Sequence, residues 1–132
     1  MPLRLRREQV RAIELELHPE QRPAYLAHLR RSFPERLRTL SDDELRERME
    51  ALLQRARGLG LHRPADDLRL LNLAVCFGWS LDRDVPWVEP MLRDASVSSS
   101  SERLRRVKAR FVRQLQLQAR NAEARRAFGP ID

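Results

Sequence analysis

The feature that most constrains this fold is an uncharged, mostly apolar run over residues 70–81. Its large apolar side chains would cover every side of a helix, and a helix that is apolar all round must be buried. We therefore expect a central helix over residues 65–78, with the rest of the chain packed around it. Cys76 lies inside this run and is expected to be buried as a small hydrophobic residue. The run is far shorter than the ~20 residues that cross a bilayer, so no membrane span is predicted.

Local signals place helices before this run. Pro19 divides the segment 1–34 into two short helices, or one kinked helix, because proline lacks a backbone donor. Ser41 followed three residues later by Glu44 is a capping-box pattern, which predicts a helix that begins there. Glycines near residues 58–60 are expected to end it.

The second half of the chain also reads as helical. Pro64 suits the first turn of the central helix, and a short helix over residues 86–92 is expected to cover one end of it as a lid. A serine-rich linker then leads into a long helix over residues 101–128. Strands are not predicted, because alternating β-branched runs are absent.

These elements predict an all-α fold, and 132 residues are enough for one domain without disulfides. We expect a single-domain antiparallel helical bundle of about five or six helices. Its expected segments are a kinked N-terminal segment (1–34), the central helices and lid (41–94) and a long basic C-terminal helix (101–128).

The net charge of +7 is concentrated on this last helix. Residues 101–127 hold nine basic side chains against two acidic ones, which equals the charge of the whole chain. Helical spacing places Leu104, Val107, Phe111, Leu115, Ala119 and Ala122 along one side. The opposite side carries what we call the arginine face: Arg103, Arg106, Arg110, Arg113 and Arg120, with Leu117 among them.

Three interpretations of the arginine face stay open at this point. It is a solvated surface, a contact for an acidic protein, or a binding site for nucleic acid phosphates. It lacks the interleaved aromatic residues that stack on single-stranded bases. Trp79 and Trp87 likewise have two interpretations, because they either close the core or anchor an interface.

No motif predicts catalysis, a metal site or a cofactor site. The three histidines, His18, His28 and His62, are scattered, and one cysteine cannot anchor a zinc site. The N-terminus has charges but no apolar segment typical of a secretory signal. We therefore expect a cytoplasmic protein that is not an enzyme and uses no metal or cofactor.

Several short motifs follow one another along the chain. They are HLRRSFPE (28–35), SDDEL (41–45), FGWSLDRDVPW (77–87), LRD (92–94) and ERL (102–104). Together they resemble the small all-helical, mostly uncharacterised bacterial proteins encoded beside type VI secretion spike and effector genes. The resemblance spans residues 25 to 107. It implies a cytoplasmic accessory role, as an adaptor, an effector chaperone or an immunity-like binder, and it transfers no catalytic residues.

The resemblance therefore implies a non-enzymatic protein-binding accessory of a type VI secretion-associated locus. Its expected partner is an acidic protein surface, such as a secretion effector or spike component; the alternative function is a small basic nucleic-acid-binding protein. The oligomeric state stays open. The candidate partner-binding residues are Arg103, Arg106, Arg110, Arg113, Leu117, Arg120 and Trp87.

Overall fold

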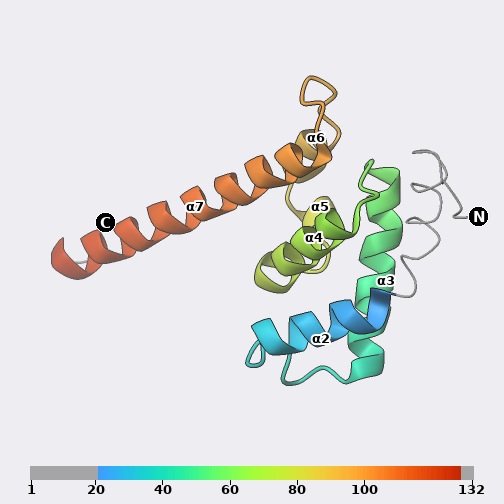
Figure 1. Cartoon of the computed structure of the whole chain (residues 1–132). Helices are drawn as coiled ribbons and strands as arrows, with labels where there is room; N and C mark the ends of the chain where they lie inside the picture. The colour runs from blue at the N-terminus through green and yellow to red at the C-terminus, as the bar shows by residue number, and fades with distance from the viewer. Residues whose placement is uncertain (1–20, 129–132) are drawn as a thin grey trace, which may run out of the picture.

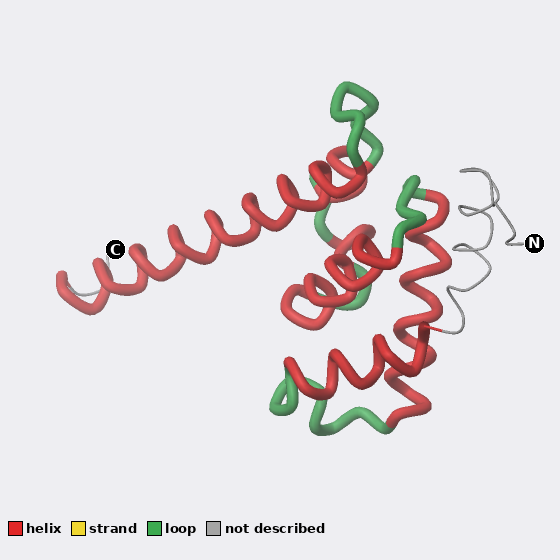
Figure 2. The backbone as a smooth tube through the Cα atoms, in the orientation of Figure 1, coloured by secondary structure: helices red, strands yellow, loops and turns green. Residues whose placement is uncertain are grey.

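The computed structural model describes residues 21–128, which form a bundle of six helices (Figure 1). In chain order they are α2 (Arg22–Ser32), α3 (Asp42–Gly58), α4 (Pro64–Phe77), α5 (Leu81–Asp84), α6 (Val88–Leu92) and α7 (Ser100–Phe128). Over this range no strand occurs (Figure 2). The predicted all-α single-domain bundle is confirmed. The expected helix before Pro19 lies outside the described residues.

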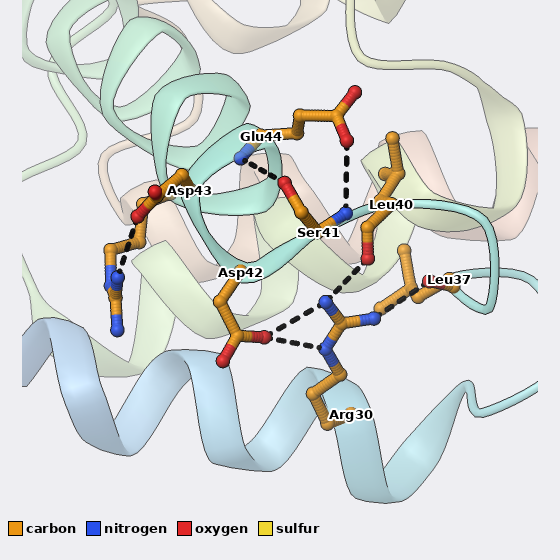
Figure 3. A network of polar contacts seen from close by, with 8 residues as sticks. Arg30, Leu37, Leu40, Ser41, Asp42, Asp43 and Glu44 are labelled. Carbon is orange, nitrogen blue, oxygen red and sulfur yellow. Dashed lines mark hydrogen bonds and ion pairs between the residues drawn. The ribbon is translucent and has the colours of Figure 1, made fainter.

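The start of α3 is the clearest case of local sequence deciding local structure. The Ser41 hydroxyl accepts a hydrogen bond from the Glu44 amide at 3.1 Å, and the Glu44 carboxylate accepts one from the Ser41 amide at 3.0 Å. This reciprocal pair is the predicted capping box (Figure 3). At the other end the helix stops at Gly58, and Gly60 adopts a positive φ of 82° that other residues rarely reach.

A single arginine organises the loop between α2 and α3. Arg30 donates hydrogen bonds to the carbonyl oxygens of Leu37 and Leu40 at 2.7 and 2.6 Å, and to the Asp42 carboxylate at 2.9 Å (Figure 3). The Leu37 carbonyl also accepts a hydrogen bond from the Leu40 amide at 3.1 Å, so Arg30 adds a second donor to a turn that lies outside any helix. The Arg30 side chain therefore fixes the angle at which the chain turns from one helix into the next.

The core lies where α2, α3 and the first part of α7 pack against α4 (Figure 1). Leu70 and Leu71 of α4 are fully buried, and so are Leu29 of α2 and Leu53 of α3. Val88 and Leu92 of the short helix α6 are also fully buried, and α6 packs against α7 and α5. That this segment covers one end of α4 stays a prediction. The uncharged run is thus the centre of the fold.

The expectation that α4 is buried on every side is wrong. Leu68, Val75 and Cys76 are each only partly buried. The reason is the small size of the bundle, because α2, α3 and α7 cover only part of the circumference of α4. Cys76 therefore stands at the boundary of the core rather than inside it.

Two adjacent carboxylates in the first turn of α4, Asp66 and Asp67, are completely buried. Asp67 accepts hydrogen bonds from the Arg57 guanidinium at 2.7 and 2.9 Å and from the Tyr25 hydroxyl at 3.3 Å. A buried charge is tolerated when it is paired and hydrogen-bonded in this way. The Arg57–Asp67 pair joins α3 to α4, and Tyr25 adds α2 to the same junction.

Asp66 performs a similar task toward α7. Its carboxylate accepts hydrogen bonds from the hydroxyls of Ser100 and Ser101, the latter at 2.8 Å, and from Arg69 at 3.1 Å. The two serines are the first residues of α7. Asp66 therefore fastens the beginning of α7 to the beginning of α4. We refer to Asp66, Ser100 and Ser101 as the serine clasp.

The ionisation of Tyr25 offers a direct test of this junction. Burial, the neighbouring charge of Asp67 and their hydrogen bond raise the pKa of Tyr25 to about 12. Tyr25 is the only tyrosine in the chain, so its ultraviolet absorbance can be followed without interference from another phenol. We expect a titration midpoint near pH 12 in the folded protein, against about 10 for a free tyrosine.

The same shift has a consequence for stability. The folded protein holds the Tyr25 proton more tightly than the unfolded chain does. The protonated Tyr25 therefore stabilises the folded state fully below pH 10, and this stabilisation is lost as the pH rises toward 12. A midpoint near 10 in the folded protein would contradict the buried Tyr25–Asp67 contact. Absorbance in denaturant provides the control.

Candidate interaction surface

Helix α7 leaves the bundle part-way along its length (Figure 1). Leu104, Val107 and Phe111 are buried, at 1%, 0% and 5% exposure. Every residue from 112 to 127 is exposed. At 1.5 Å per residue this part spans about 24 Å. We call residues 112–127 the extension.

An aromatic cluster marks the point where the extension begins. The Phe111 ring stacks on Phe77 at the end of α4, with 4.1 Å between ring centroids. The Trp87 ring packs against Phe111, with 4.6 Å between ring centroids. The Arg110 guanidinium lies over the Trp87 indole at 4.3 Å, in a cation–π arrangement. Trp87 therefore helps to close the core, while its partial burial leaves some of the ring accessible. Trp79 is also partly buried against the core.

The arginines predicted to share one face have different roles. Arg103 is partly buried and donates hydrogen bonds to the carbonyl oxygens of Val97, Leu92 and Ser98, at 2.7, 3.1 and 3.4 Å. Its guanidinium is thus used to hold the loop that precedes α7. Arg106 is exposed and forms a weak ion pair with Glu102 at 3.5 Å. Arg103 acts within the scaffold, although its spacing placed it on the open face.

Two other members of the face, Arg113 and Arg120, are free to meet a partner. Within residues 21–128, Arg113 and Arg120 are exposed and form no hydrogen bond or ion pair. Leu117 lies between them in the sequence and is 55% exposed. Of the predicted binding residues, Arg113, Leu117 and Arg120 therefore lie on the extension. Arg103, Arg106, Arg110 and Trp87 lie where α7 joins the bundle.

The extension is electrostatically one-sided. It carries four arginines, Arg113, Arg120, Arg125 and Arg126, against the single carboxylate of Glu123. Its formal charge is therefore +3. By contrast, charges elsewhere on the bundle are often paired, as in Arg22–Glu50 and Arg93–Glu89.

The histidines of the described range do not form a cluster with other metal-binding side chains. His28 is hydrogen-bonded to Asn72 at 3.1 Å, and His62 is exposed; His18 lies outside the described range. In residues 21–128 no three histidine, cysteine or carboxylate side chains gather at a distance suited to a metal ion. A depression of about 310 Å³ on α3 is open to solvent and is lined by Glu44, Glu47, Arg48 and Ala51.

None of the helices in the described range has the length and apolar character needed to cross a membrane. No protein-family model, curated protein or solved structure matches this chain.

Proposed function

We propose that this protein is a non-enzymatic protein-binding accessory that contacts an acidic partner through the extension of α7. The observation that carries the proposal is that residues 112–127 are all exposed and carry a formal charge of +3. A helical extension with no buried residue contributes little to holding the bundle together. Binding to another molecule gives the extension a role.

Charge and composition favour a protein partner over nucleic acid. The extension contains no aromatic residue that could stack on bases, but it exposes Val112, Leu115 and Leu117. Apolar side chains among arginines are typical of protein interfaces, where arginine forms bidentate pairs with carboxylates. The alternative, a small basic nucleic-acid-binding protein, is favoured only by the unpaired positive charge, which supports weak and non-specific phosphate binding.

The cellular setting of the proposal comes from the sequence resemblance. Similarity to small helical proteins of type VI secretion loci supports a cytoplasmic role beside a secretion effector or a spike component. In that setting the protein would act as an adaptor, an effector chaperone or an immunity-like binder. The extension is compatible with all three roles, because each requires a surface that remains free while the bundle stays folded.

Reversing two charges on the extension tests this proposal. Arg113→Glu combined with Arg120→Glu changes the formal charge of the extension from +3 to −1. We expect the affinity for a partner isolated with the wild-type chain to fall at least tenfold, because attraction becomes repulsion. The measurement is isothermal titration calorimetry with the purified partner, in parallel with binding of a labelled 20-base-pair DNA duplex at physiological salt.

The matched control makes the same change in net charge elsewhere. Arg36→Glu with Arg38→Glu alters two exposed arginines in the loop between α2 and α3. This control should leave partner affinity unchanged. If the extension variant kept its partner and instead lost submicromolar binding to the duplex, nucleic-acid binding would be the correct function.

A further inference from the structure

Exposed leucines lie on two different sides of the extension. Leu115 is 50% exposed and Leu117 is 55% exposed. Because successive residues of an α-helix are rotated by about 100°, these two side chains point about 160° apart. A flat partner surface can contact one of them but not both.

Leu115 continues the side of α7 that faces the core. It follows the buried Phe111 by four residues, so its side chain lies on the same side of the helix one turn further along. Val112, which is 39% exposed, borders this side. Leu117, in contrast, projects from the side that carries Arg113 and Arg120. The extension therefore exposes apolar side chains on two sides: Leu115 on the side that faces the core earlier in α7, and Leu117 on the opposite, charged side.

Resting on the proposed function, we propose that the partner surrounds the extension, accepting it as an inserted helix in an acidic cleft with apolar pockets on both walls. Carboxylates along the cleft would pair with Arg113 and Arg120, and its pockets would take Leu115 and Leu117. Insertion of a helix into a groove is a recurring mode of recognition. The structure leaves access for it, because each residue of the extension is exposed.

A second copy of this chain is a poor occupant for the same surface. Two extensions lying side by side would bring together eight arginines and two glutamates, which gives a formal charge of +6 over about 24 Å. Like charges at that density oppose association. Charge complementarity therefore points to a different, acidic protein.

Photo-crosslinking from single positions distinguishes a cleft from a flat surface. A benzoylphenylalanine residue is introduced at Leu115 or at Leu117 of the full chain, produced in cells of the organism that encodes it. Crosslinked products are identified by mass spectrometry. We expect both positions to crosslink to the same acidic protein, and position 36, in the loop before α3, to give no such product.

Each other outcome has a defined meaning. Crosslinking from only one of the two positions would overturn the cleft and leave the proposed function intact. A product of twice the chain mass would show that a second copy occupies the extension. Absence of any protein product at both positions, together with loss of duplex binding by the double arginine variant, would overturn the cleft and the proposed function together.

A stability measurement tests whether another part of this chain covers the extension. Leu115→Gln and Leu117→Gln keep the charge and the helix propensity, and we expect neither to shift the melting temperature of the isolated chain by more than about 2 °C. A larger decrease for either variant would show that another part of this chain covers the extension, which would overturn the proposal.

Discussion

Replacing Phe111 with alanine is expected to lower the free energy of unfolding by about 3–5 kcal/mol, the usual cost of removing a buried aromatic ring. Phe111 is only 5% exposed, and it contacts both Phe77 of α4 and Trp87 at the start of α6. Its loss would leave a cavity where three elements meet. Chemical denaturation followed by tryptophan fluorescence measures the effect, since Trp87 reports on the same junction.

The residue one turn further along α7 provides the matched control. Leu115 lies on the same side of the helix but is 50% exposed. Leu115→Ala should therefore change the free energy of unfolding by no more than about 0.5 kcal/mol. Equal losses for the two variants would show that the core continues along α7 beyond Phe111, and that the extension is misplaced.

Replacing Arg57 with methionine is expected to cost about 3–5 kcal/mol, because it removes the cation that neutralises a buried carboxylate. Asp67 is 0% exposed and receives two hydrogen bonds from this guanidinium. Methionine fills similar volume, so the loss would come mainly from the uncompensated charge. Thermal and urea unfolding at pH 7 measure it.

The control is an arginine of the same helix whose ion pair is exposed. Arg46 contacts Asp43 at 3.1 Å, but the two side chains are 54% and 96% exposed. Exposed pairs contribute about 0–1 kcal/mol, so Arg46→Met should have little effect. If Arg57→Met proved equally mild, the Asp67 carboxylate would have to be far better solvated than the structure shows.

Helix boundaries were predictable because short-range signals determine them. Ser41 and Glu44 lie three residues apart, and Pro64 sits at the first position of α4. In both cases the residues that fix the backbone are neighbours in the sequence. The length and apolar character of residues 70–81 similarly indicated which helix would be central.

The polar junctions of the bundle could not be predicted in this way. Asp66 and Asp67 have the appearance of ordinary acidic residues in a first helical turn, where the helix dipole favours negative charge. Their burial depends on Ser100, Ser101, Arg57 and Tyr25, which lie between 10 and 42 residues away. Sequence pattern does not show which distant donors the fold will bring to a carboxylate.

Only part of the candidate surface could be predicted from the sequence, again because residues distant in the chain decide what is buried. Helical spacing correctly separated the apolar side of α7 from the arginines. It did not show that the bundle ends near Phe111, nor that Arg103 turns back to the carbonyl oxygens of Leu92 and Val97. Periodicity gives the direction of a side chain, whereas the neighbouring helices decide what covers it.

Several positions of the short motifs singled out in the sequence are explained by the fold. Arg30 and Asp42 join α2 to α3, Asp82 is buried against Arg55 at 2.9 Å, and Arg103 holds the loop before α7. The extension follows the last of these positions. These motifs therefore describe the scaffold more than the surface proposed to bind a partner.

The serine clasp lies at the start of α7, where a small rotation of the helix moves its far end by a large distance. The helix is about 43 Å long and packs against the bundle only over about its first 18 Å, from Ser100 to Phe111, and Asp66, Ser100 and Ser101 lie at the start of that part. A rotation of only about 10° at the start of α7 would move the far end by about 7 Å, a distance calculated from this length. The hydrogen bonds of Asp66 with Ser100 and Ser101, together with the buried side chains up to Phe111, thus set the direction of a contact surface that lies several helical turns away.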